Sequence, residues 1–191
     1  EIIKDYAEQY YQHVKAFPRY ISATHSICED LEKRRILLEN LQDEENKDGD
    51  HPKLWKNFAK ALGADEKEIE KVKLDWFTKD MIDNFFYQAR KSYAEGLASL
   101  YTYERQIPEI AETKIQGLKK FYGVSSKKGL EFFEAHKSAD VIHRAECEKL
   151  LDSLSKEEQE KAERSSLLTA RYLWNFLSGM TSKHKLESIA A

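Results

Sequence analysis

The spacing of the apolar residues is the feature that most constrains the fold of this chain. Apolar side chains recur at intervals of three and four residues along almost the whole sequence, and no segment sustains the alternation of a half-buried strand. Only 7 glycines and 3 prolines occur among 191 residues, which leaves little of the turn chemistry that a sheet requires. The sequence therefore predicts an all-α protein.

Turn and capping signals divide this pattern into seven or eight helices. Proline is tolerated in the first turn of a helix, so His51-Pro52 is expected to open one of them. Ser155 followed by Glu158 has the spacing of a capping box and marks the start of the last helix. The expected helices cover residues 1–20 with a bend near Pro18, 22–46, a segment that starts at 51, 66–90, 92–107, 109–121, 126–154 and a segment that starts at 155.

Length and periodicity predict a single domain. A chain of 191 residues can bury a sizeable core, and no linker or internal repeat divides this one. We expect the domain to cover residues 1–180, followed by a loosely ordered tail over 181–191, because the periodicity is lost from residue 178 onward. The chain starts without a methionine inside a helical pattern, so we also expect an N-terminal segment to be missing.

Charge and hydropathy exclude several classes of partner. The net charge of −3 provides no strong basic field, so we expect no nucleic-acid partner. No apolar run approaches the roughly 18 residues needed to cross a membrane, and the mean hydropathy is −0.72. Cys28 and Cys147 lie far apart and lack the spacing of a metal or redox motif. These features predict a reduced, cytoplasmic protein that binds neither nucleic acid nor membrane.

One stretch places three metal-capable side chains within eight residues. In AHKSADVIH (135–143), His136, Asp140 and His143 are spaced at i, i+4 and i+7 and fall within an arc of about 60° on a helix. Phe132 and Leu150 are among the apolar residues that bracket this arc, so the three side chains face the core. A buried carboxylate is costly unless it is paired or metal-bound. The pattern leaves open a metal or catalytic site, a buried His–Asp–His cluster, or a polar seam at a subunit interface.

A second helix adds a carboxylate on its apolar face. Glu104 shares a stripe with Leu97, Leu100 and Ile107, which directs its side chain toward the core. The alternative is a glutamate that reaches outward at a helix end, because Pro108 lies just beyond.

A third contribution comes from the junction between two helices. Glu44 and Glu45 end one helix, and His51 starts the next. On a helical wheel Glu45 lies nearer the middle of the apolar stripe than Glu44. Periodicity alone therefore favours Glu45, or a solvated helix end for both. With either glutamate, the inward-facing set comprises three carboxylates and three imidazoles. Helical bundles bind two divalent ions with such a set, and it suits iron or manganese better than structural zinc.

Four stretches resemble the subfamily named after the Chlamydia protein associating with death domains, within the TenA/PqqC group of haem-oxygenase-like helical proteins. They are DYAEQYYQHVKAFPRYISATHS (5–26), LLENLQDEENKDGDHPKLW (37–55), LYTYERQIPEIAETKIQGL (100–118) and FFEAHKSADVIH (132–143). The resemblance covers most of residues 5–180 and implies a haem-oxygenase-like fold, a centre of two iron ions and O₂ as co-substrate. It also implies Glu44 rather than Glu45 as a ligand. The implied ligands are Glu44, His51, Glu104, His136, Asp140 and His143.

The resemblance also implies a chemistry. Such relatives are implicated in making p-aminobenzoate for folate by oxidising a tyrosine of their own chain, with a lysine as the amino donor and an external reductant. Lys114 matches that lysine and Tyr6 matches a tyrosine beside the site, while Tyr103 directly precedes a ligand. The tyrosine usually held responsible would lie before Glu1. From the residues alone, Lys114 also fits an ordinary surface lysine, and the aromatic stripe containing Tyr10 also fits plain core packing.

Other functions remain as alternatives. A conventional di-metal oxygenase with a small-molecule substrate would use the same ligands. A TenA-type aminopyrimidine hydrolase needs a cysteine nucleophile on the helix of Glu104, where none occurs. A PqqC-like oxidase needs a basic pocket, whereas this one is predicted to be acidic. Binding to host death domains is implied by resemblance only, and the relatives also suggest a homodimer.

Overall fold

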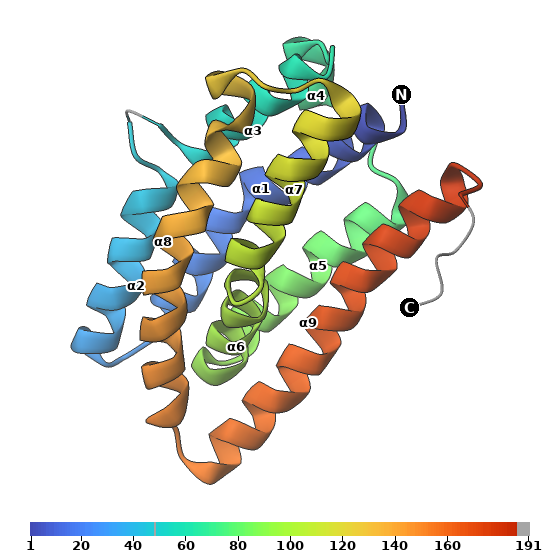
Figure 1. Ribbon diagram of the computed structural model, residues 1–191. Helices are drawn as coiled ribbons and strands as arrows, with labels where there is room; N and C mark the ends of the chain where they lie inside the picture. The colour runs from blue at the N-terminus through green and yellow to red at the C-terminus, as the bar shows by residue number, and fades with distance from the viewer. Residues whose placement is uncertain (48, 187–191) are drawn as a thin grey trace.

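The computed structural model of this chain is a bundle of α-helices (Figure 1). It describes residues 1–47 and 49–186, without the side chains of 138–142, and no strand occurs in these ranges. The all-α prediction is therefore confirmed over the described residues, with nine helices there rather than seven or eight. They are α1 (Ile2–Ser26), α2 (Leu31–Glu44), α3 (His51–Ala61), α4 (Glu66–Lys71), α5 (Trp76–Lys91), α6 (Tyr93–Glu104), α7 (Ile107–Tyr122), α8 (Lys127–Asp152) and α9 (Lys156–Lys183).

Three predicted helix boundaries were wrong, and one of them is the start of α2, which lies at Leu31 and not near residue 22. Helix α1 does not end near residue 20 but continues through Pro18 to Ser26, and residues on both sides of the proline are buried. The helix expected over 66–90 is interrupted at 72–75. There the amide of Gln9 donates to the carbonyl of Lys73 and accepts from the backbone N–H of Asp75, at 3.0 and 3.1 Å. A side chain distant in sequence thus forms the hydrogen bonds that these backbone groups lose where the helix is interrupted. Local periodicity cannot predict such a contact.

Two signals at the ends of the last helix had different outcomes. Ser155 and Glu158 form the reciprocal capping box that their spacing predicts. Helix α9 then runs to Lys183, several residues beyond the point where apolar periodicity fades. Gly179 allows this last part of α9 to approach α5, because a Cβ atom there would lie 2.2 Å from the ring of Phe77. The loosely ordered tail stays a prediction, and residues 187–191 lie outside the described range.

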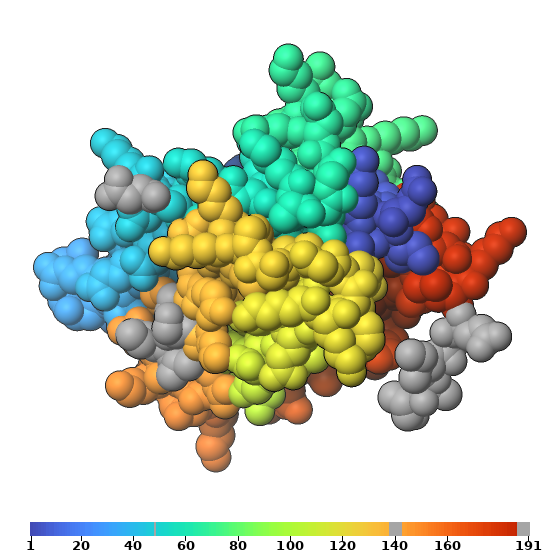
Figure 2. All heavy atoms as spheres, turned by 45° about the horizontal axis from the view of Figure 1, so that its top comes forward, coloured from blue at the N-terminus to red at the C-terminus, as the bar shows by residue number. Residues whose placement is uncertain are grey.

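The remaining helices surround α1 and enclose the core. Helix α1 packs against α2, α3, α5 and α6, while α9 lies along α5 and α6, and α7 lies along α8. Figure 2 shows α7 (yellow) at the surface between the first turn of α1 (blue) and α8 (orange). The indole N–H of Trp55 donates to the carbonyl of Ala7 at 2.7 Å and ties α3 to α1. None of the described helices combines the length and apolar character needed to span a membrane.

Candidate metal centre

The junction between α2 and α3 brings a carboxylate and an imidazole together in the core. Glu44 is the last residue of α2, and His51 is the first residue of α3. The side chain of Asp50 accepts a hydrogen bond from the backbone of Lys53 at 2.8 Å, which fixes the start of α3. Nδ1 of His51 lies 2.7 Å from Oε2 of Glu44, and the two residues are 7% and 5% exposed.

Helix α8 adds a second imidazole to this pair. The ring centroid of His136 lies 4.2 Å from that of His51 and 4.0 Å from that of Phe132. Nδ1 of His136 lies 2.7 Å from the carbonyl oxygen of Phe132. Donation to this carbonyl places the proton on Nδ1 and leaves the lone pair of Nε2 available, as is usual for metal-binding histidines.

These three residues have the arrangement of a metal site. One ligand atom from each of Glu44, His51 and His136 lies within 4.8 Å of the others. Bonds of about 2.1 Å would place the ligands of a single ion at most about 4.2 Å apart, so small side-chain shifts suffice. Nδ1 of His51 forms no regular hydrogen bond despite its closeness to Glu44, and Nδ1 of His143 is likewise buried without a partner. The donors present therefore fit a divalent cation.

Burial controls the protonation of the two imidazoles. Desolvation lowers the pKa of His136 to about 3, and the neighbouring His51 contributes in the same direction. Desolvation also acts to lower the pKa of His51, but the negative charge of Glu44 outweighs it, and the pKa is raised. His136 is therefore neutral near pH 7, as a metal ligand must be.

Glu104 lies at the end of α6 and points into the core. The residue is 2% exposed, as its apolar stripe predicts, so it does not reach outward at the helix end. Its Oε1 accepts from Nδ2 of Asn40 at 2.7 Å, and its Oε2 accepts from the thiol of Cys147 at 3.6 Å. Desolvation raises the pKa of Glu104 to about 7 although Asn40 lowers it, and the charge of Glu44 raises it further. Glu104 is not part of the tight group of three.

The remaining predicted ligands lie on α8. His143 is 8% exposed, and its Nε2 lies 3.1 Å from Oδ2 of Asp43. The structure does not bring it into the group formed by Glu44, His51 and His136. The side chain of Asp140 lies outside the described residues, so its role stays a prediction. Glu45 is exposed, in contrast to the buried Glu44 beside it.

A lysine and two tyrosines lie beside this cluster. Nζ of Lys114 donates a hydrogen bond to the hydroxyl of Tyr6 and lies 4.7 Å from the centroid of its ring. The same ammonium lies within 6 Å of the rings of Tyr10 and Trp55. This lysine is therefore held among aromatic rings and is not an ordinary surface residue. Tyr103 is 4% exposed and hydrogen bonds with Tyr10.

Aromatic side chains connect the cluster to the lysine. The ring of Phe132 contacts His136 and lies 4.8 Å from Trp55. Trp55 in turn lies 6.1 Å from Tyr6. A cavity of about 120 Å³ opens beside Tyr6, and neither Phe132 nor Trp55 is among its lining residues. Its lining includes Tyr6, Tyr10, Tyr103, Gln106, Lys114 and Phe176.

Sequence reasoning missed two residues that contact Glu104. Asn40 lies four residues before Glu44 on α2, and Cys147 lies four residues after His143 on α8. Each of them is therefore one helical turn from a predicted ligand and on the same face. That spacing could have identified both.

Fold and site together define a class of protein. Over the described residues it is an all-α bundle that holds a buried cluster of carboxylates and imidazoles. The family described as iron-containing redox enzyme matches residues 4–174, and the chain belongs to this family.

Individual relatives agree with this assignment. The chain is 42% identical over 178 residues to a protein of Chlamydia trachomatis serovar D named 4-aminobenzoate synthase. The matched region covers 93% of this chain and 77% of the relative. A solved TenA homologue from Pseudomonas syringae pv. tomato superposes with a TM-score of 0.82 at 17% identity, over 95% of this chain and 80% of that one. A CADD-like protein from Nostoc punctiforme gives 0.80 at 14% identity, over 95% and 82%. These two likenesses confirm the predicted fold.

Proposed function

We propose that this protein is a non-haem oxygenase with two metal ions, iron by preference over manganese, that makes 4-aminobenzoate. In this proposal it oxidises a tyrosine of its own chain with O₂ and takes the amino group from Lys114. The observation that carries the proposal is the short aromatic path from the buried Glu44–His51–His136 cluster to Lys114 and Tyr6. The family description and the name of the Chlamydia relative support it.

The donor set determines which residues would hold the ions. Glu44, His51 and His136 would bind one ion, and Glu104, Asp140 and His143 complete the proposed set. Non-haem iron oxygenases bind iron through two histidines and one carboxylate and leave other coordination positions open. Bound iron would supply the electrons and the open positions that O₂ activation requires. Nδ1 of His136 carries a proton and donates it in a hydrogen bond to the carbonyl oxygen of Phe132, and this bond orients the ring.

The residues beside the cluster would position and protect the reacting groups. Lys114 holds its ammonium at the hydroxyl of Tyr6, so a phenol and an amine already lie in contact. Tyr103 is buried and directly precedes Glu104 in the chain. Trp55 and Phe132 are 1% and 4% exposed and exclude water from the space between the two groups.

The cavity beside Tyr6 supports a second candidate, a conventional oxygenase with an external substrate. Its volume of about 120 Å³ is close to the roughly 150 Å³ of an engineered cavity that binds benzene, so a small aromatic molecule is the right size. In both candidates the protein needs an external reductant. We further propose a cytoplasmic homodimer, and the two free cysteines support a reducing compartment.

Intact mass after a single turnover separates the two candidates. The full-length protein is loaded with Fe(II), given a reductant and exposed to O₂, and the supernatant is assayed for 4-aminobenzoate. We expect the product to appear at no more than about one per chain, together with a matching loss of mass from the protein. An unchanged mass, with product formed only from an added substrate, would contradict self-oxidation and favour the second candidate.

A matched pair of lysine variants tests the amino donor. Lys114→Arg keeps the positive charge but removes the primary amine, and we expect it to bind metal and make no 4-aminobenzoate. Lys119→Arg on the exposed side of α7 is the control and should keep full product yield. A full yield of 4-aminobenzoate from the Lys114→Arg variant would show that the nitrogen comes from another source.

A further inference from the structure

Glu104 is held by two side chains that carry no charge. Nδ2 of Asn40 donates to Oε1 at 2.7 Å, and the thiol of Cys147 donates to Oε2 at 3.6 Å. The three residues come from three helices, α2, α6 and α8, and are 2–4% exposed. Each oxygen of this carboxylate therefore has one donor of its own.

The neutrality of these donors distinguishes them from ordinary ion-pair partners. A lysine or arginine would orient Glu104 but would also offset its negative charge, whereas an amide and a thiol leave most of that charge in place. Among the described side chains, no lysine or arginine forms an ion pair with Glu104. Each carboxylate oxygen has two lone-pair positions, so one donor per oxygen leaves one position on each oxygen for a cation.

The two donors are also placed with the proposed ligands in sequence and in space. Asn40 lies on α2 one turn before Glu44, and Cys147 lies on α8 one turn after His143. Helices α2, α6 and α8 each contribute a ligand of the proposed centre. The same contacts that orient Glu104 thus connect these three helices at the site.

We infer that Asn40 and Cys147 are positioning residues for Glu104, which orient its carboxylate toward the metal ions while leaving its charge available to them. This inference rests on the proposed function, because it requires Glu104 to be a metal ligand. It assigns to Cys147 the role of a hydrogen-bond donor and not that of a ligand or nucleophile. Residues that support a metal ligand in this way typically change metal affinity by about 10–100-fold when they are removed.

Cobalt titration of donor variants tests the inference without the need for turnover. Co(II) is added to the metal-free protein, and its visible absorption bands report both affinity and ligand geometry. We expect Cys147→Val, which fills the volume of the sulfur but cannot donate, to weaken binding by about 10-fold and to shift the bands. Cys147→Ser keeps a donor and should stay near the wild-type affinity. Cys28→Val, at the other buried cysteine, is the matched control and should leave affinity and bands unchanged.

Asn40→Leu tests the second donor in the same way. This substitution keeps the approximate size of the side chain and removes the amide, and we expect about a 10-fold weaker Co(II) affinity. Thermal melting of each metal-free variant shows whether it is folded. If Cys147→Val does not fold, Cys147→Ala and Asn40→Leu carry the test. Wild-type affinity in a folded variant that lacks its donor would overturn the role of that residue.

A double-mutant cycle distinguishes positioning through Glu104 from a general structural effect. In a Glu104→Gln background, Cys147→Val should cause little further loss of Co(II) affinity, because its effect passes through the missing carboxylate. Fully additive losses would overturn the inference. A different result would contradict the proposed function itself, namely that the wild-type protein binds no Co(II). If Glu104→Gln weakens binding and the donor variants do not, only the present inference fails.

Discussion

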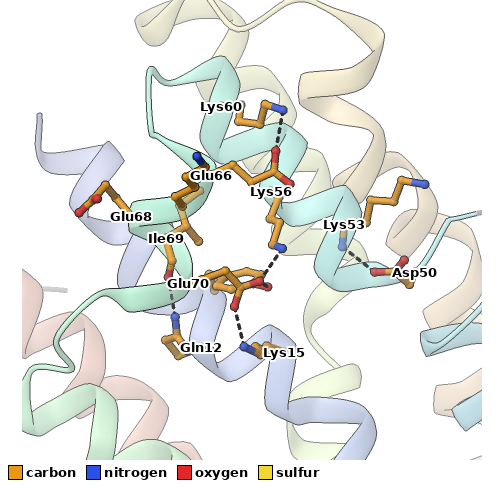
Figure 3. A network of polar contacts seen from close by, with 12 residues as sticks. Gln12, Lys15, Asp50, Lys53, Lys56, Lys60, Glu66, Glu68, Ile69 and Glu70 are labelled. Atoms are coloured by element: carbon orange, nitrogen blue, oxygen red, sulfur yellow. Dashed lines mark hydrogen bonds and ion pairs between the residues drawn. The ribbon is translucent and has the colours of Figure 1, made fainter.

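Two glutamates of this protein, one exposed and one buried, have opposite surroundings. Glu70, on α4, accepts hydrogen bonds from the hydroxyl of Tyr11 at 2.7 Å and the ammonium of Lys15 at 2.6 Å, and Nζ of Lys56 lies 2.5 Å away (Figure 3). Partial burial acts to raise its pKa, but these donors lower it to about 2. The chain itself therefore supplies the positive charge that Glu70 needs.

Glu104 has no such partner. Its donors are neutral, Glu44 adds a second negative charge nearby, and the pKa of Glu104 is raised to about 7. Glu44 itself pairs only with His51 among the described side chains. The comparison separates a carboxylate that the chain's own cations neutralise from one that has no cationic partner among the described side chains, and we propose a metal ion as the partner of the second. It leads to predictions of different size for the two regions.

The largest effect is expected from removing an imidazole of the proposed centre. His136→Ala deletes a ligand in the core, and we expect metal affinity to fall by more than about 100-fold, beyond what is usual for residues that only support a ligand. Metal content after iron loading and desalting measures this loss. His13→Ala is the matched control, because His13 is 0% exposed, is surrounded by aromatic rings and belongs to no metal group among the described side chains. Equal metal content in the two variants would contradict the assignment of the site.

Metal binding should also stabilise the fold as a whole. The metal-free protein buries Glu44 and Glu104 close to each other, and a bound cation removes that cost. At a free metal concentration of about 100 times Kd, binding to the native state contributes about 2.7 kcal/mol. For a domain of this size we expect Tm to rise by roughly 5–10 °C. Calorimetry with and without Mn(II) tests this, and His136→Ala should show almost no shift.

Removal of Glu70 should have a smaller effect that is independent of metal. Glu70→Gln weakens two ion pairs in which the Glu70 side chain is 33% exposed, so we expect a loss of about 1 kcal/mol in the free energy of unfolding, after allowance for solvent screening. Urea titration measures it. Glu66→Gln is the matched control, since among the described side chains Glu66 forms an ion pair only with the exposed Lys60 and should change stability very little. A loss of bound metal in the Glu70→Gln variant would contradict the assignment of a purely structural role to Glu70.

The contribution of Glu70 should depend on pH in a defined direction. The pKa of this carboxyl falls from 4.5 to about 2 on folding, so its stabilising effect is present above about pH 4.5 and is lost as pH falls toward 2. We therefore expect the difference in stability between wild type and Glu70→Gln to shrink over that range. A difference that is constant from pH 6 to pH 3 would contradict this explanation of the ion pairs.

The fold was largely predictable because helical periodicity is a local property. It located most helices, and the capping box at Ser155 marked the start of α9 correctly. The interruption at 72–75 was not predictable, since its stabilising partner Gln9 lies on α1. The first helix was expected to end near residue 20 with a bend at Pro18, but residues on both sides of Pro18 are buried and α1 continues to Ser26.

The candidate site was predictable only in part, for geometric reasons. A helical wheel ranks Glu45 above Glu44, but α2 ends at Glu44 and Glu45 has already left helical geometry, with φ −107° and ψ 21°. Extrapolation of the wheel by one residue therefore points to the wrong side chain. Lys114 shows the same limit, because the chain turns between α6 and α7 and the angle between Glu104 and Lys114 cannot be read from one continuous helix. In both cases the resemblance supplied what periodicity could not.

Anomalous diffraction at the iron edge would locate the proposed metal ions in the protein. Crystals of the protein grown after anaerobic Fe(II) loading would show where the metal lies relative to Glu44, His51 and His136. We predict two peaks per chain, one within bonding distance of these three residues and a second on the side of Glu104 and His143. Full occupancy by iron elsewhere, with no peak between Glu44 and His136, would contradict this prediction.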